Sequence, residues 1–298
     1  MLVVINKIDL QKPSPEQLKF LQLKSERILT VSCINETKRQ NYLEALKQQL
    51  LEVAPADFRG NPSLIGDLLP PGGLSVLVVP IDLQAPKGRL ILPQVQAIRD
   101  ILDNDASAVV VKERELAATL ANLKNPPSIV VTDSQAILKV TADVPNDIPV
   151  TTFSILFARQ KSDLATMAAG AAAIDQLEPG DRVLIAEACS HHALEDDIGR
   201  VKIPRWLRQY VGGDLQIDTV CGRDYPENLK DYKLIFHCGA CMINRREMMT
   251  RLHKAKEANV PITNYGVAIS FLQGVLKRSL APFPSALAAF EKSTLIRS

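Results

Sequence analysis

Two stretches decide how this sequence folds: VLIAEACSHH at residues 183–192 and LIFHCGAC at residues 234–241. Each starts with a short apolar run, which is typical of a buried strand, and each ends in cysteine and histidine. In an open parallel sheet, ligands bind outside the carboxyl ends of the strands. The two clusters of cysteine and histidine can therefore meet at one edge of a sheet, although they lie far apart in the chain.

The regions around these stretches alternate apolar strands with helical segments. Strands are expected at 74–79, 108–111, 129–132, 215–220 and 260–264, and helices at 94–102, 113–120, 164–177 and 245–259. This alternation predicts an α/β protein with mostly parallel sheets and flanking helices. Residues 54–73, rich in proline and glycine, form the clearest linker, so we expect a multidomain chain.

The composition argues against several classes of protein. The 298 residues carry 35 basic and 33 acidic side chains, so no basic excess indicates a nucleic-acid partner. No apolar run reaches the roughly 18 residues that a membrane-spanning helix needs. The first residues, MLVVINK, have neither the charged leader nor the small-residue cleavage site of a secretory signal. We therefore expect a cytoplasmic protein.

Three of the five cysteines and three of the four histidines fall in the two clusters. Three interpretations are open. The cysteines can be buried small hydrophobic residues. Cys238 and Cys241 can form a thioredoxin-like redox pair between a strand and a helix, which leaves Cys189 and His191 unexplained. The clusters can also bind metal, either as a zinc site or as an iron–sulfur cluster with one open iron, and composition alone does not separate these two.

The order Cys-x-His and then His-Cys-x-x-Cys, present here as Cys189, His191, His237, Cys238 and Cys241, closely resembles the signature of the [FeFe]-hydrogenase maturation GTPase family. Proteins of this family are scaffolds for assembly of the hydrogenase active site. The resemblance extends over essentially the whole chain, with further similar segments at 85–96, 187–192, 195–206, 244–247 and 261–266.

The resemblance implies three domains. They are the C-terminal remnant of a P-loop GTPase domain at 1–55, a dimerisation domain at 56–148 and a cluster-binding domain at 149–298. It further implies that Cys189, Cys238 and Cys241 bind a [4Fe–4S] cluster, with His191 and His237 as a fourth ligand or as support for the ligands.

The implied function is to hold a di-iron precursor bearing CO and cyanide near that cluster and to deliver it to apo-[FeFe]-hydrogenase. Radical-SAM maturases and a second copy of this chain are the other implied partners. Two alternatives remain open: a thiol–disulfide or electron-transfer module that uses Cys238 and Cys241, and a structural zinc protein.

The front of the chain differs from the family pattern. Asn6, Lys7 and Asp9 resemble the guanine-specificity motif of GTPases, and Ser32 stands where the next base-contacting motif falls. No Gly-x-x-x-x-Gly-Lys-[Ser/Thr] phosphate loop occurs in the sequence. We therefore interpret the chain as lacking the front of the GTPase domain, through a truncated gene, a misplaced start or a fragment. GTP binding is a family property that is doubtful here, and hydrolysis by this chain alone is not expected.

Five basic residues flank the two clusters: Arg200, Lys202, Arg205, Arg245 and Arg246. Guanidinium and ammonium groups there can hold an anionic precursor, or they can be ordinary surface charge. Other polar and thiol residues receive less specific expectations. Asp196 and Asp197 can form a carboxylate pair or be solvated, and we favour the second interpretation. His253 is expected at the surface, and Cys33 and Cys221 are expected to pack.

Overall fold

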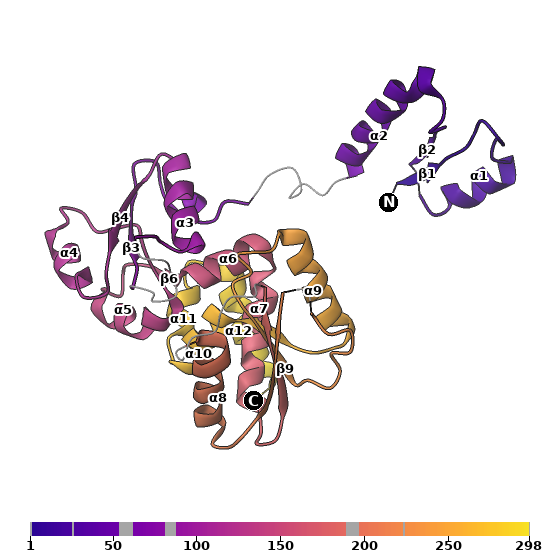
Figure 1. Cartoon of the computed structure of the whole chain (residues 1–298). Coiled ribbons are helices and arrows are strands. Elements are labelled where there is room, and N and C mark those ends of the chain that lie inside the picture. The colour runs from indigo at the N-terminus through magenta and orange to yellow at the C-terminus, as the bar shows by residue number, and fades with distance from the viewer. Residues whose placement is uncertain are drawn as a thin grey trace. The chain divides into compact units, whose positions relative to one another are not determined.

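The computed structural model describes residues 2–25, 27–53, 62–80, 88–188, 197–222 and 224–297. The chain divides into two compact units, Met1–Pro62 and Ser63–Ser298 (Figure 1). Within the described residues, no helix is both long and apolar enough to cross a bilayer.

The first unit contains a small parallel sheet. Its two strands pair with Val3 opposite Ile28 and Ile5 opposite Thr30. Ser14 and Gln17 form a reciprocal capping box that starts the first helix, with Pro15 at its first position. The elements are β1 (Val3–Ile5), α1 (Pro15–Gln22), β2 (Ile28–Thr30) and α2 (Arg39–Val53).

The second unit begins with a four-stranded parallel sheet in the order β4-β3-β5-β6. Its central strands are apolar and buried on both faces, as parallel strands covered by helices are. The strands are β3 (Leu74–Val78), β4 (Ser107–Val111), β5 (Ile129–Thr132) and β6 (Val150–Thr152), and the helices α3 (Leu92–Asp103), α4 (Leu116–Asn122) and α5 (Ile137–Asp143) lie around them (Figure 1).

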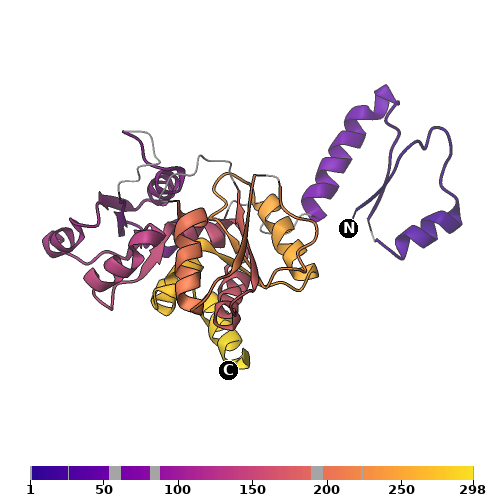
Figure 2. The ribbon, with the colours of Figure 1, turned by 60° about the horizontal axis from the view of Figure 1, so that its bottom comes forward.

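The rest of the second unit is built on another parallel sheet, in the order β10-β9-β7-β8. Helices α8 and α9 lie on opposite sides of this sheet in both views (Figures 1 and 2). The strands are β7 (Arg182–Glu187), β8 (Gln216–Cys221), β9 (Leu234–His237) and β10 (Ile262–Asn264), and the helices are α6 (Phe153–Lys161), α7 (Leu164–Ala171), α8 (Ile203–Val211), α9 (Arg245–Glu257), α10 (Tyr265–Leu272), α11 (Leu276–Leu280) and α12 (Pro284–Arg297).

Alternate residues of β7 and β9 fill two different cores. Val183, Ile185 and Phe236 belong to the core that contains α8 and α10 residues, whereas Leu184 and Ile235 pack with residues of α9. This two-sided burial explains why these strands appear in the sequence as continuous apolar runs.

The prediction of an α/β protein with parallel sheets and flanking helices is confirmed. The apolar pattern does not predict β6 or α6, because Val150–Thr152 is short and the following helix is apolar without a clear amphipathic period. β6 pairs with β5, with Val130 opposite Val150. The strand thus joins the middle sheet although it lies beyond residue 148, and the domain boundaries given above stay predictions.

Asp100 of α3 anchors the start of the second unit. Its Oδ2 accepts hydrogen bonds from the hydroxyl of Ser63 at 2.9 Å and from the backbone N–H groups of Leu64, Ile65 and Gly66 at 3.1, 2.8 and 2.7 Å. Burial by itself raises the pKa of Asp100, but these four donors outweigh it and leave the pKa below its usual value of 3.8.

Replacing Asp100 by alanine is therefore expected to destabilise the second unit by about 3 kcal/mol, because three N–H groups lose a charged acceptor. Urea unfolding at pH 7 measures the loss. Asp100→Asn, which keeps one acceptor oxygen, should lose less.

The lowered pKa of Asp100 also makes this stabilisation depend on pH. The stabilisation by the carboxylate is present above about pH 4 and is lost as the pH falls below it, so the asparagine variant should lose less stability than the parent between pH 5 and pH 3. Equal acid sensitivity in the two proteins would contradict this role.

Candidate functional site

The two cysteine-bearing stretches meet at the carboxyl ends of β7 and β9. The strands are direct neighbours, with Ala186 opposite His237. Beyond the strands, the N–H of Cys238 donates to the carbonyl of Ala186 at 2.9 Å, and the N–H of Ala188 donates to Sγ of Cys238 at 3.0 Å. The chain segment that leads into Cys189 thus starts in contact with Cys238. Cys189 and His191 themselves lie outside the described residues.

Cys238 and Cys241 lie on the loop that joins β9 to α9, and the side chains of both are partly buried. Asn244 ends this loop and caps α9 by accepting the N–H of Glu247 at 2.9 Å. Burial raises the pKa of the Cys241 thiol, whereas Lys161 and the N–H groups of Cys241 and Met242 oppose this rise. Over the part of the chain that the structure describes, no three ligating side chains gather at one point.

Lys161, the last residue of α6, contacts the same loop. Its Nζ donates to the carbonyl oxygens of Ala240, Cys241 and Ile243 at 3.0, 2.9 and 2.8 Å. Burial lowers the pKa of Lys161, and the nearby Cys241 and Cys238 partly offset this effect. A basic group thus lies next to the two cysteines without standing in either of the stretches that predicted the site.

Arg245, the first residue of α9, contacts the end of α6 in turn. Its Nη1 donates to the carbonyls of Gln160 and Ser162 at 2.9 and 3.0 Å. The end of α6 and the cysteine loop therefore hold each other through two cationic side chains.

The other flanking basic residues differ in their surroundings. Arg200 pairs with the fully buried Glu187 at 3.2 Å, and Nζ of Lys202 donates to the side chain of Gln135 at 2.6 Å. Arg205 and Arg246 are exposed.

The expectation of a solvated Asp197 is wrong. This residue is buried, and its carboxylate accepts the N–H of Arg200 at 2.8 Å at the start of the turn 198–202. Cys33 was predicted to pack in the interior, and this prediction is wrong, because the residue is exposed. His253 is exposed, as predicted, and pairs with Glu257 at 3.2 Å.

His237 is fully buried beneath the loop, and both of its ring nitrogens are engaged. Nδ1 lies 2.9 Å from the carbonyl oxygen of Cys238, and Nε2 lies 3.1 Å from Nη1 of Arg251. Because arginine only donates, Nε2 must accept and Nδ1 must carry the proton. Burial, and to a lesser degree the Arg251 charge, lower the pKa of His237 to about 4, although the bond to Cys238 opposes this. The neutral ring supports the backbone of Cys238 and has no free lone pair for a metal in this arrangement.

Arg251 is the buried cation that fixes this histidine. Its side chain is 2% exposed, its Nη2 donates to the carbonyl of Gly222, and its guanidinium lies 5.0 Å from the ring centre of Tyr225. It ties the segment that follows β8 to the last residue of β9. No sequence pattern predicts this role, since one more arginine in a charged helix is typical of a surface residue.

The carboxyl ends of the two large sheets also contact each other. Ser154, just after β6, donates to Oδ1 of Asn264 at 3.1 Å and accepts the N–H of Gly266 at 3.1 Å. A Cβ on Gly266 would lie 2.7 Å from Oγ1 of Thr152, so this close approach requires glycine. The cysteine loop takes part, because a Cβ on Gly239 would lie 3.6 Å from Oγ of Ser154.

The residues that resemble guanine-contacting motifs of GTPases lie in the first unit. Oδ1 of Asn6 accepts the N–H of Cys33 at 3.2 Å, and the hydroxyl of Ser32 donates to Asp9. Lys7 adopts a left-handed backbone with φ 62° between them. The two short motifs are thus brought side by side, as base-contacting motifs need to be.

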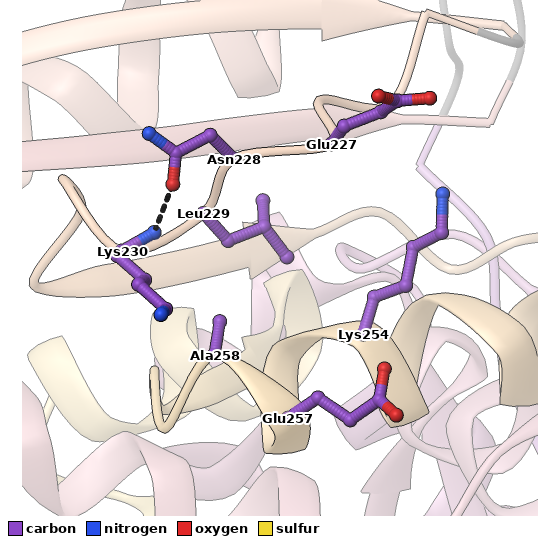
Figure 3. Close-up of a pocket in the computed structure, with 7 residues that line it drawn as sticks. All are labelled: Glu227, Asn228, Leu229, Lys230, Lys254, Glu257 and Ala258. Carbon is purple, nitrogen blue, oxygen red and sulfur yellow. Dashed lines mark hydrogen bonds between the residues drawn. The ribbon is translucent and has the colours of Figure 1, made fainter.

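One surface pocket lies elsewhere. It is lined by Glu227–Lys230 together with Lys254 and Glu257 of the C-terminal part of α9 and Ala258 just after it (Figure 3). Its charges are mixed in sign, and none of the predicted site residues lines it. We therefore assign the pocket no part in the site.

Comparison with known protein families identifies most of the second unit. Residues 64–162 match the family model of the hydrogen maturase F dimerization domain, and residues 165–282 match that of the hydrogen maturase F tetramerization domain. A comparison with curated proteins found no match. Both family models name domains of one maturase.

Proposed function

Because this chain belongs to the hydrogen maturase F family and so serves in hydrogenase maturation, we propose that it holds a [4Fe–4S] cluster on Cys189, Cys238 and Cys241 as an assembly scaffold. The observation that carries the proposal is the contact of the Ala188 N–H with Sγ of Cys238 at 3.0 Å. Cys189 is covalently next to Ala188, which is why we propose it as the third ligand beside the two cysteines of the loop.

The donor chemistry of the loop fits an iron–sulfur cluster. Cys238 accepts the N–H of Ala188 at its sulfur, and the backbone N–H groups of Cys241 and Met242 oppose the rise that burial causes in the pKa of the Cys241 thiol. Hydrogen bonds to cysteine sulfur stabilise thiolate ligands and tune cluster potentials. When bound, the cluster supplies an iron that is not fully ligated by cysteine.

We assign different roles to the two histidines of the signature. His237 donates to the Cys238 carbonyl and accepts from Arg251, so we propose that it supports the backbone of Cys238. His191 then remains as the candidate fourth ligand. Arg200 and the exposed Arg246 are candidates for holding an anionic di-iron precursor with CO and cyanide, which the scaffold delivers to apo-[FeFe]-hydrogenase after radical-SAM maturases supply it.

The arrangement of Asn6, Asp9 and Ser32 further supports recognition of a guanine base by the first unit. The Asp9 carboxylate accepts hydrogen bonds, and the guanine edge carries N–H donors that match it.

Transfer to apo-hydrogenase tests the scaffold function. Protein matured with the radical-SAM enzymes should restore hydrogen evolution to apo-[FeFe]-hydrogenase, and a Cys189→Ser variant treated in the same way should not. A thiol–disulfide module would behave differently, because Cys189→Ser would keep full dithiol activity at Cys238 and Cys241. Dithiol activity without any hydrogenase activation would contradict the scaffold function.

We also propose which surface joins two copies of the chain. Both matched family models describe oligomerization domains, so the chain forms oligomers. β4 lies at the edge of the middle sheet, and among the described strands only β3 pairs with it. Its sequence, SAVVV, has no charge or proline of the kind that prevents edge pairing. We propose that β4 pairs with β4 of a second copy and forms the homodimer.

The register of β4 allows a selective test. The N–H of Ser107 donates to Gly73, just before β3, and the carbonyl of Val111 accepts the N–H of Val79, just after it. The alternate residues Ala108 and Val110 therefore direct their N–H groups to the open edge. Val110→Pro removes one outward donor and leaves the β3 pairing intact. Sedimentation should show that this variant forms a smaller assembly than the parent, with an unchanged circular dichroism spectrum. An assembly of unchanged size would exclude β4 as the interface.

A further inference from the structure

Lys161 uses all of its hydrogen-bonding capacity on the cysteine loop. An ammonium group has three donors, and those of Lys161 reach the carbonyl oxygens of Ala240, Cys241 and Ile243 at 3.0, 2.9 and 2.8 Å. Bonds from an ionised donor are stronger than neutral ones. One side chain from α6 therefore fixes the path of the loop on both sides of Cys241.

The loop needs such support at Ala240. This buried residue has φ 56°, in the left-handed region that is unfavourable for a residue with a Cβ. Backbone conformations of this kind persist where the surroundings hold them. The bond from Lys161 to the carbonyl of Ala240 itself provides that hold.

The charge of Lys161 is close to both described cysteines. Among the groups that act electrostatically on Lys161 are Cys241 and Cys238. The ammonium is partly removed from solvent, so its field is screened less than that of a surface lysine. A positive charge in this position offsets the negative charge of the thiolates and stabilises the reduced state of a cluster, which carries one more negative charge than the oxidised state.

We propose that Lys161 is a positioning residue of the cysteine site: it holds residues 240–243 in place, and its charge raises the reduction potential of a cluster bound at Cys238 and Cys241. The second half rests on the proposed function. The first half concerns the chain alone and stands without a cluster. Net charge and hydrogen bonding near the sulfurs are two of the factors that set cluster potentials.

The experiment compares full-length protein with Lys161→Met, Lys161→Arg and the control Lys139→Met, which removes an exposed lysine from α5. Hydrogen–deuterium exchange of the metal-free proteins measures the positioning. Lys161→Met should increase exchange in the peptide that covers 240–244 by about tenfold or more, because charge-assisted bonds to three carbonyls are lost.

Redox titration of the reconstituted proteins measures the effect of the Lys161 charge on the cluster. Lys161→Met should shift the midpoint potential to more negative values, and Lys161→Arg should restore it toward that of the parent.

The outcomes separate the two proposals. Exchange in Lys161→Met equal to that in the parent would overturn the positioning role, and an unchanged potential in this variant would overturn the charge effect. A parent protein that takes up no cluster would instead refute the proposed function, while the exchange data would still decide the positioning role. If Lys161→Met does not fold, Lys161→Gln, which is neutral and keeps a donor, replaces it in both measurements.

Discussion

Gly170→Ala is expected to destabilise the second unit by about 3 kcal/mol or more, at the upper end of what overpacking costs. Gly170 lies in α7 where the helix packs on β10, and a Cβ there would lie 2.0 Å from the carbonyl oxygen of Ile262. That atom is backbone within a sheet, so it cannot move aside as a flexible side chain would. In an open helix position the same change would stabilise the protein by roughly 1 kcal/mol, so the sign of the effect is diagnostic.

The displaced strand would also disturb the site. β10 ends at Asn264, whose side chain bonds Ser154, and β10 pairs with β9, which leads into the cysteine loop. Urea unfolding of the metal-free protein measures the loss. Ala169→Ser is the matched control, because Ala169 lines the open groove between α7 and α9 and has room for an oxygen atom. A Gly170→Ala protein within about 0.5 kcal/mol of the parent, the range of an ordinary surface substitution, would show that α7 does not pack as described.

Cys238→Ser is expected to reduce cluster loading by at least about tenfold, because a serine hydroxyl does not replace a thiolate as an iron ligand. The fold should survive, since the serine oxygen can still accept the N–H of Ala188 that Sγ accepts in the parent. Iron and acid-labile sulfide per chain after anaerobic reconstitution, together with a thermal unfolding curve, measure both parts of this expectation.

Two cysteines serve as controls for that experiment. Cys33 is exposed in the first unit, and Cys221 lies at the end of β8, opposite Glu187 of β7. Serine at either position should leave iron and sulfide content unchanged. Loss of the cluster in Cys221→Ser would contradict the ligand set of Cys189, Cys238 and Cys241, because it would add a thiolate from a third strand end.

The fold class and the pairing of β7 with β9 at one sheet edge could be predicted from the sequence alone. Strands buried on both faces produce continuous apolar runs, and Val183–Glu187 and Leu234–Phe236 are such runs. Because parallel neighbours end at the same sheet edge, the cysteines behind them were expected to come together. The structure places Ala188 and Cys238 in contact, while the positions of Cys189 and His191 stay predictions.

The supporting residues could not be predicted, because their roles depend on distant partners. Lys161 ends a helix that has no clear period in the sequence, and its three acceptors lie about eighty residues further along the chain. Arg251 stands among other charged residues of α9, and only the fold buries it beneath His237. Asp197 looks like a surface residue for the same reason, although the fold buries it where it caps the turn 198–202.

The central claim, an iron–sulfur cluster on this cysteine site, is tested most directly by anaerobic reconstitution of the full chain with ferrous iron and sulfide. Metal analysis and electron paramagnetic resonance after reduction give the result. The account predicts about four iron and four sulfide per chain, a brown protein and a signal of a reduced [4Fe–4S] cluster. A colourless protein that holds one zinc and gives no signal would contradict it.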